Sequence, residues 1–229
     1  MLPRAYERIP KDLVQDIFVT DNCSKDDAVG ASRALGLPIF RNDRNLGYGG
    51  NLKAGLTKAM ERGADYAVEV HGDGQFDTDA LRQAMPLIDA GTDFIIGSRF
   101  AVPGQARLYG MPLSRYLANK GLSALDRAVL GLPFTEFHCG FRVFSRKLLA
   151  RVPWSAGSDD YLFGFQIIAQ VAYMGLSVGE IPIRADYIGD HTSISILRSA
   201  KYAAQTTVVL GQFILARLGL PHRLFPVRP

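Results

Sequence analysis

Three side chains that can bind a metal ion follow one apolar segment of the sequence. Residues 67–75 read AVEVHGDGQ, so His71, Asp73 and Gln75 occupy alternate positions. Side chains two positions apart on an extended chain point to the same side, so an imidazole, a carboxylate and an amide oxygen should converge there. This donor set suits a divalent ion such as Mn²⁺ or Mg²⁺. A polar turn that ends a buried strand is the simpler alternative.

Other polar clusters also stand where predicted strands end. They are Asp21 with Ser24, the glycine-rich run from Asn45 to Asn51, and the turn that contains Arg99. Ligands bind at the carboxyl ends of strands in open α/β sheets, so we expect these clusters to form one site. Taken alone, the first cluster has the composition of a common turn. The glycine-rich run alone is equally consistent with a flexible loop whose Asn51 caps a helix.

The order of these motifs resembles that of family-2 glycosyltransferases, and most of all the dolichyl-phosphate (polyprenyl-phosphate) mannosyltransferase-like branch. That family has an Asp-x-x-Ser turn, an Asn-x-Gly-x-Gly-x-Asn loop, an Asp-x-Asp-type metal motif and a Gly-Ser-Arg turn. All four motifs occur here in that order, within about residues 1–200. The resemblance implies a GT-A-type nucleotide-diphospho-sugar transferase fold, an α/β structure with a mainly parallel sheet flanked by helices. Alternating strand and helix patterns favour the same arrangement.

The predicted elements follow from periodicity and from helix-ending residues. Helices are expected over residues 2–13, 26–35, 51–62, 78–89 and 113–130, and strands over residues 16–20, 39–40, 66–70 and 93–96.

The resemblance also implies roles for individual residues. Asp73 would bind the metal, Mn²⁺ or Mg²⁺, together with Gln75 and His71. The catalytic residues would be Asp73, Arg99 and Arg115. Because His71 stands where the family more often has aspartate, we expect Mn²⁺ to be preferred. The donor nucleotide would be bound by Asp21, Ser24, Asn45, Gly47, Asn51 and His191. Either Asp190 or His191 would complete the coordination when the loop around them closes.

A phosphate-bearing acceptor would need cationic side chains. The resemblance makes Arg99 the first choice and Arg115 the second, with Asn119 one helical turn later. The arginine fork suits a phosphate because it presents two donors at once. The basic amphipathic helix over residues 113–130 can lie on an anionic membrane or pack on a core with solvated charges.

The acceptor determines the mechanism, and other readings stay open. Attack by an ionised lipid phosphate needs no base and inverts the anomeric configuration. Transfer to a sugar hydroxyl, in glycan or cell-envelope synthesis, would need a base such as Asp159 or Asp160, which are otherwise a helix-capping pair. A third reading is an inactive nucleotide-binding remnant. His138 and Cys139 are adjacent but lack the oriented partner that a nucleophile requires.

The beginning of the chain departs from the family pattern. Family members begin with a strand, whereas Met1 falls where the family's first helix is under way. We therefore expect a glycosyltransferase domain over residues 1–198, shortened at its N-terminus relative to the family. The absent strand is normally central, so an open position in the sheet, low stability and self-association are expected.

Composition places the chain among ordinary globular proteins. Its 229 residues suit one α/β core, and the net charge of +4 suits anionic partners. The expected partners are a GDP- or UDP-sugar, a lipid phosphate and a membrane surface, without nucleic acid. Two cysteines make no disulfide framework, which favours a cytoplasmic protein at the cytoplasmic membrane face. Residues 199–229 are expected to form a helix and tail at that surface, too polar to span it.

Overall fold

The computed structural model describes residues 2–185 and 196–226. The predicted site residue His191, with Asp190, lies outside these described residues. The strands are β1 (Val19–Asp21), β2 (Ile39–Arg41), β3 (Tyr66–Glu69), β4 (Phe94–Ser98), β5 (Arg142–Ser145) and β6 (Val178–Pro182). The α-helices are α1 (Leu2–Glu7), α2 (Ala28–Ala34), α3 (Gly47–Glu61), α4 (Leu81–Asp89), α5 (Gln105–Leu108), α6 (Leu113–Leu130), α7 (Arg146–Arg151), α8 (Phe163–Met174) and α9 (Ile196–Arg217). Short 3₁₀ turns span η1 (Thr78–Ala80) and η2 (Trp154–Ala156).

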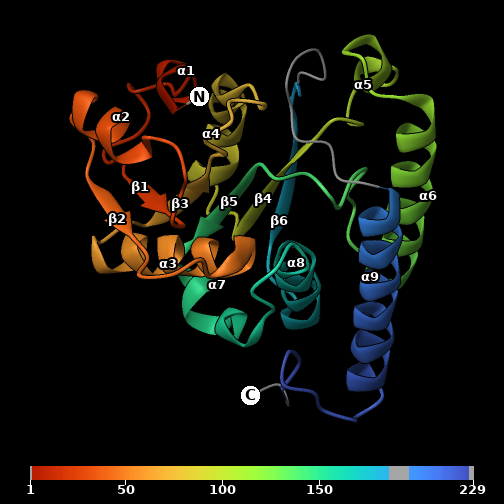
Figure 1. The fold of residues 1–229 in the computed structure, drawn as a ribbon. Coiled ribbons are helices and arrows are strands. Elements are labelled where there is room, and N and C mark those ends of the chain that lie inside the picture. The colour runs from red at the N-terminus through yellow and green to blue at the C-terminus, as the bar shows by residue number, and fades with distance from the viewer. Residues whose placement is uncertain (1, 186–195, 227–229) are drawn as a thin grey trace.

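The strands form two separate sheets (Figure 1). β1 and β2 pair in parallel, and the second sheet has the order β3-β5-β4-β6. β4 and β6 are parallel, whereas β5 runs antiparallel to both of its neighbours. The α/β prediction is confirmed, and β5 is the strand that departs from a parallel arrangement. Its direction follows from the preceding chain, because Thr135 and Phe141 already lie beside the carboxyl end of β4.

An open position separates the two sheets. Among the strands in the described part of the chain, β1 pairs only with β2 and β3 only with β5. Residues of both strands line one cavity of about 1780 Å³, together with apolar side chains that include Leu13, Val14 and Phe18. The expected gap beside the metal-motif strand is therefore confirmed. Helix α3 contacts both β1 and β3 and so connects the sheets across this gap.

The helices form layers around the four-stranded sheet. α4 packs on β6, and α8 packs against α9 and α6, the two long helices that lie side by side at the far end from β2 (Figure 1). α8 is apolar and almost completely buried, which identifies it as the central helix of the core. The same core includes Val209, Leu210 and Phe213 of α9. No helix in the described residues is long and apolar enough to span a bilayer.

Several element boundaries differ from those predicted. The first helix ends at Glu7, and β1 begins at Val19. α6 has the predicted bounds. The late start of β1 has a physical cause: the Val19 N–H donates to the Pro38 carbonyl, but proline has no N–H with which to extend the pairing toward Ile17.

Candidate active site

A network of asparagines joins the turn after β1 to the glycine-rich run. The side-chain amide of Asn22 donates to Asn45 Oδ1 and to the Gly47 carbonyl, both at 3.0 Å. Asn51 Nδ2 donates to the Thr20 carbonyl at 3.2 Å, and Asn51 Oδ1 accepts from Asn42 at 2.8 Å. The two predicted nucleotide-binding segments therefore form one structural unit.

Asp21 ends β1 and is almost fully buried. Its Oδ1 accepts from the Ser24 backbone N–H at 3.0 Å, which fixes the Asp-x-x-Ser turn. Its Oδ2 lies 3.2 Å from Nε of Arg41, its neighbour on β2. Thr20, Tyr48 and Asn51 line the cavity, whereas the predicted nucleotide-binding residues Asp21, Ser24, Asn45 and Gly47 are not among its lining residues.

The glycines of the run allow α3 to approach the Ser158–Asp160 loop. A Cβ on Gly47 would lie 2.3 Å from the Asp159 carbonyl oxygen, and one on Gly49 would lie 2.5 Å from that of Ser158. The helix begins at Gly47, so the alternative in which Asn51 is its N-cap is wrong. Asn51 lies inside the first turns of α3, and its side chain is used by the asparagine network instead.

The metal motif lies on a turn. β3 ends at Glu69, and the Gly74 N–H donates to the His71 carbonyl at 3.2 Å, with Gly74 at a φ of +65°. The expectation of an extended segment with His71, Asp73 and Gln75 on one side is wrong, because this turn reverses the chain. All three residues nevertheless line the cavity. Asp73 is exposed and accepts from the Gln75 N–H at 2.9 Å.

A buried polar cluster supports His71 from the strand side. Arg142 Nη1 pairs with Glu69 Oε2 at 3.0 Å, and the Tyr48 hydroxyl donates to Glu69 Oε1. His71 Nε2 lies 3.2 Å from both Glu69 Oε1 and the Tyr48 oxygen. Burial alone would raise the pKa of Glu69, but the charge of Arg142 and these hydrogen bonds outweigh it and lower that pKa below 4.5. Burial and the nearby Glu69 raise the pKa of Tyr48 well above 10.

The residues of the turn fit a divalent cation that is also bound by a substrate. Among the described residues, no three His, Cys, Asp or Glu side chains converge on one point. Mg²⁺ is commonly held by one or two carboxylates together with substrate phosphates, so a complete protein cage is not required. An exposed Asp73, an imidazole backed by a buried carboxylate and the amide of Gln75 lie on one wall of the cavity. The chemistry of this donor set therefore fits Mn²⁺ or Mg²⁺.

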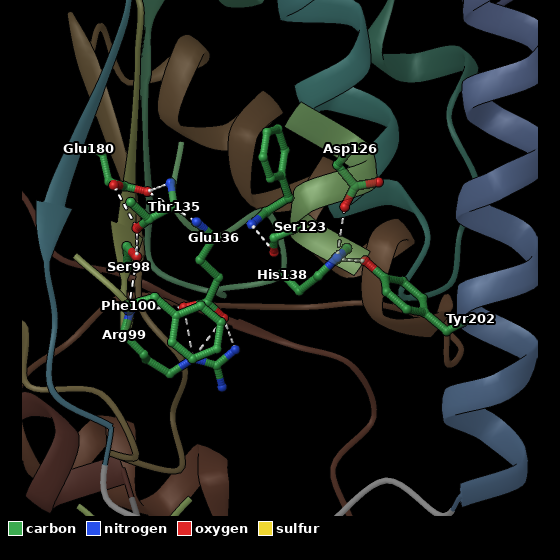
Figure 2. A network of polar contacts seen from close by, with 11 residues as sticks. Ser98, Arg99, Phe100, Ser123, Asp126, Thr135, Glu136, His138, Glu180 and Tyr202 are labelled. Atoms are coloured by element: carbon green, nitrogen blue, oxygen red, sulfur yellow. Dashed lines mark hydrogen bonds and ion pairs between the residues drawn. The ribbon is translucent and has the colours of Figure 1, made fainter. Parts of the chain in front are cut away.

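Arg99 reaches the cavity already paired with an acid. Its backbone N–H and its Nε each donate to Glu136 at 2.8 Å, and the Glu136 side chain is completely buried. Figure 2 shows this pair beside the Ser98–Thr135–Glu180 contacts. Burial raises the pKa of Glu180. Arg99 is thus held in a fixed orientation with its charge largely compensated.

Other cationic side chains line the same cavity. Arg115 and Asn119 of α6 line it, as do Arg198 and Lys201 of α9. Arg115 takes part in no ion pair among the described residues. The structure therefore brings the two predicted acceptor arginines to one region and adds cations from a helix that is about 80 residues later in sequence.

His138 and Cys139 have structural environments. His138 Nε2 lies 3.0 Å from buried Asp126, and its Nδ1 lies 3.2 Å from the Tyr202 hydroxyl of α9 (Figure 2). Burial raises the pKa of the Cys139 thiol to about 12, which excludes a thiolate nucleophile near neutral pH.

The two aspartates before α8 occupy different positions. Asp159 lies 2.5 Å from Lys53 and points toward α3. Asp160 lines the cavity, and its Oδ1 accepts from the Leu162 N–H at 2.9 Å. Helix α8 has Leu162 as its N-cap and no side-chain cap, so the capping alternative is wrong for both aspartates, and Asp160 only stabilises the turn before the helix.

Sequence reasoning missed Glu69, Tyr48, Arg198 and Lys201. A signal existed for Glu69, because a carboxylate inside an apolar strand is buried only with a partner. The partner, Arg142, lies 73 positions away, and the sequence does not indicate that pairing.

Comparisons with known proteins agree on one family. The family model described as Glycosyl transferase family 2 matches residues 2–152. A UDP-N-acetylglucosamine–dolichyl-phosphate N-acetylglucosaminyltransferase from Methanococcus voltae is 30% identical over 180 residues, covering 78% of this chain and 67% of that protein. A polyprenol monophosphomannose synthase from Mycolicibacterium smegmatis is 29% identical and covers 73% of this chain and 65% of that protein. The chain thus spans about two thirds of the length of these relatives.

Solved structures share the fold. Glucosyl-3-phosphoglycerate synthase from Mycobacterium tuberculosis, in complex with Mn²⁺, UDP-glucose and phosphoglyceric acid, superposes with a TM-score of 0.66. The match covers 96% of this chain and 76% of that one at 18% identity. This similarity establishes the GT-A architecture.

Proposed function

Because the chain belongs to glycosyl transferase family 2, we propose that it transfers a sugar from a nucleotide-sugar donor to a polyprenyl (dolichyl-type) phosphate. The relatives from Methanococcus voltae and Mycolicibacterium smegmatis, and an undecaprenyl-phosphate mannosyltransferase from Micrococcus luteus that is 28% identical, are named for lipid-phosphate acceptors of this class. The donor is a uridine or guanosine diphosphate sugar.

This proposal rests on one observation. A single cavity is lined both by the His71–Gln75 turn and by cations of two helices, Arg115 and Lys201 among them. A donor diphosphate and an acceptor phosphate are both anions, and their reacting atoms must meet. A cavity lined by both a metal-binding turn and cationic side chains can hold both.

On the donor side, each predicted residue has a proposed role. Asp21 and Ser24 hold the base and ribose, while Asn45, Gly47 and Asn51 form the floor beneath the nucleotide. His191, which lies outside the described residues, binds the diphosphate in this proposal. Asp73 is the principal ligand of Mn²⁺ or Mg²⁺, with His71 and Gln75 completing the protein's share. When bound, the ion neutralises charge on the departing nucleoside diphosphate.

On the acceptor side, Arg115 binds the lipid phosphate and Arg99 orients it. A phosphate monoester loses its second proton with a pKa of about 6, so its oxygen is already ionised near neutral pH. Direct attack of that oxygen on the anomeric carbon needs no base and inverts the configuration there. The positive charges let the two anions approach each other, and positioning supplies most of the rate.

Exposed apolar side chains on both long helices suit a membrane-bound acceptor. On α6 they are Leu113, Leu117 and Leu125, and on and after α9 they are Val208, Ile214, Leu215, Leu218 and Leu220. These helices lie next to each other and both line the acceptor end of the cavity. These side chains support a position of the protein at the surface of a membrane. There a lipid phosphate would pass from the headgroup layer into the cavity. The cytoplasmic face of the membrane is part of the same proposal.

The test is transfer of radiolabelled sugar to polyprenyl phosphate, followed by organic extraction of the product. Arg115→Ala should reduce the rate about tenfold to a hundredfold, because a charge-assisted contact contributes roughly 1.5–3 kcal/mol. The matched control is Lys120→Ala, which removes a cation from the same helix outside the cavity lining. Donor binding should be nearly unchanged in both variants.

Transfer to a sugar hydroxyl is the second candidate, because the carboxylate of Asp160 lines the cavity. Asp160→Asn should have little effect if the acceptor is a phosphate that needs no base. If this variant stops turnover while Arg115→Ala does not, the lipid-phosphate function is excluded and the hydroxyl acceptor replaces it. Asp159→Asn serves as the control, because Asp159 pairs with Lys53 on α3.

A further inference from the structure

His71 contacts two hydrogen-bond acceptors through one ring nitrogen. Its Nε2 lies 3.2 Å from a carboxylate oxygen of Glu69 and 3.2 Å from the hydroxyl oxygen of Tyr48. The Tyr48 proton is directed to Glu69, and the Tyr48 oxygen also accepts from Arg142 at 3.3 Å. Glu69 is buried 3.0 Å from the Arg142 guanidinium, which is the environment of an ionised carboxylate.

These contacts determine which ring nitrogen of His71 carries the proton. An ionised carboxylate accepts hydrogen bonds and donates none, and the Tyr48 hydroxyl has already given its proton to Glu69. Nε2 must therefore be the N–H, and the neutral imidazole has its lone pair on Nδ1. Close packing also holds the ring in position. It lies so near Gly140 that a Cβ at that position would be 2.5 Å from its Cε1 atom. The Phe76 ring packs against it with 5.5 Å between the ring centroids.

We propose that Glu69 is a positioning residue that holds His71 as the Nε2–H tautomer, so that Nδ1 is available to a divalent cation. This inference rests on the proposed function, which assigns the cation to the His71–Gln75 turn. A carboxylate that accepts the second N–H of a metal-bound histidine fixes the tautomer and raises the basicity of the ligand. Glu69 and His71 together thus take the place of the first aspartate of an Asp-x-Asp motif.

The arrangement also accounts for histidine at position 71. An aspartate there would bring a second carboxylate toward Glu69, and like charges at close range disfavour ionisation of both groups. His71→Asp, which restores the more common family motif, should therefore weaken Mn²⁺ binding in this protein. The double variant Glu69→Gln, His71→Asp should bind Mn²⁺ more tightly than His71→Asp alone, because the repulsion is removed.

The first measurement is the tautomer of His71 in the metal-free wild-type protein. Two-bond ¹H–¹⁵N spectra distinguish Nδ1–H from Nε2–H, and loss of the signal in His71→Gln assigns it among the four histidines. An Nε2–H tautomer is expected. An Nδ1–H tautomer overturns the inference, and the tautomer itself is read from the wild-type protein, with His71→Gln needed only for the assignment.

The second measurement is Mn²⁺ affinity by calorimetry in the presence of nucleoside diphosphate. Glu69→Gln should weaken binding about tenfold to a hundredfold, the usual effect of losing a partner behind a metal-bound histidine. Asp79→Asn is the charge control, because Asp79 is an exposed carboxylate near the turn that pairs with Arg82. Thermal melting verifies that each variant is folded at the temperature of the titration.

The outcomes separate the two proposals. Loss of Mn²⁺ binding in Asp73→Asn with unchanged affinity in Glu69→Gln overturns the role of Glu69 and leaves the proposed function intact. Unchanged affinity in Asp73→Asn overturns the metal site itself, and the role of Glu69 with it.

Discussion

At the scale of single residues, the site combines one exposed carboxylate with supports that are buried. Asp73 is exposed on the cavity wall, whereas Glu69 and Arg142 are buried behind it. Replacing one member of a buried ion pair lowers the free energy of unfolding, whereas replacing an exposed metal ligand changes binding alone. Variants of Asp73 therefore report on chemistry more cleanly than variants of its supports.

Asp73→Asn should abolish metal-dependent binding of the donor nucleotide, because the amide has no negative charge to offer the ion. In the wild-type protein Mn²⁺ should support tighter binding than Mg²⁺, since a nitrogen ligand suits the softer ion. Calorimetric titration of nucleoside diphosphate with each metal measures both effects. Equal binding by Asp73→Asn and the wild-type protein would falsify the metal assignment.

At the scale of elements, α3 owes its position to glycine. Gly49→Ala would place a Cβ 2.5 Å from the Ser158 oxygen and 2.7 Å from the Asp160 oxygen. Overpacking of this kind costs about 1–3 kcal/mol, so the melting temperature and nucleotide affinity should both fall. Gly55→Ala is the control on the same helix, because its nearest neighbour would be Thr20 Oγ1 at 3.4 Å. The control should be neutral or stabilising by up to about 1 kcal/mol, and a larger loss there than at Gly49 would contradict this account.

Asp93 ties the start of β4 to the neighbouring strands. Its buried carboxylate accepts from the Ser177 hydroxyl at 2.8 Å and from Lys147 at 3.1 Å. Burial alone would raise its pKa, but these hydrogen bonds outweigh that effect and lower the pKa below 3.8. A depressed folded pKa contributes stability above the unfolded pKa, and this contribution is lost as the pH falls through the folded value.

Asp93→Asn should therefore be less stable than wild type at pH 7, by about 1–3 kcal/mol. Its free energy of unfolding should also change less than that of wild type as the pH falls below 3.8. Urea unfolding between neutral and acidic pH measures both quantities. Asp65→Asn, at an almost fully exposed carboxylate, should follow the wild-type curve. Identical pH dependence in Asp93→Asn and wild type would remove Asp93 as a source of acid lability.

The elements also show what the sequence can and cannot predict. Helical periodicity predicted both ends of α6 correctly. Its apolar and polar residues recur at helical spacing within that segment, so no distant contact is needed to recognise it. Helix α3 begins at Gly47, before the predicted start at Asn51. Its glycines make room for residues 158–160, and the local sequence does not indicate that these distant residues pack there. The turn at His71 and the pairing of Glu69 with Arg142 likewise depend on long-range packing. Some of the residues chosen from motif order line the cavity, among them Asn51, Asp73 and Arg115, whereas Asp21, Ser24, Asn45 and Gly47 are not among its lining residues. The compensation of Arg99 by Glu136 is a tertiary contact that motif order does not indicate.

At the scale of the whole molecule, two strand edges face an open cavity. β1 and β3 each expose one edge of backbone N–H and C=O groups, and unpaired edges are templates for association. The protein should therefore associate as its concentration rises, and an added extended apolar strand should raise its melting temperature. Sedimentation velocity over a range of concentrations measures the first effect. A monomer at all concentrations with one cooperative melting transition would show that the edges are not accessible.

The division into two sheets also affects the energetics of donor recognition. β1 and β2 have three residues each, and Asp21 is their one buried side chain. Few buried apolar contacts place a segment at the low end of local stability, so this part of the protein should open more often than the four-stranded sheet. A ligand that binds only the closed form has its apparent affinity reduced by the fraction of open molecules. Donor affinity would then report how often the first sheet is folded, and substitutions in α2 or β2 would alter it without touching a ligand contact.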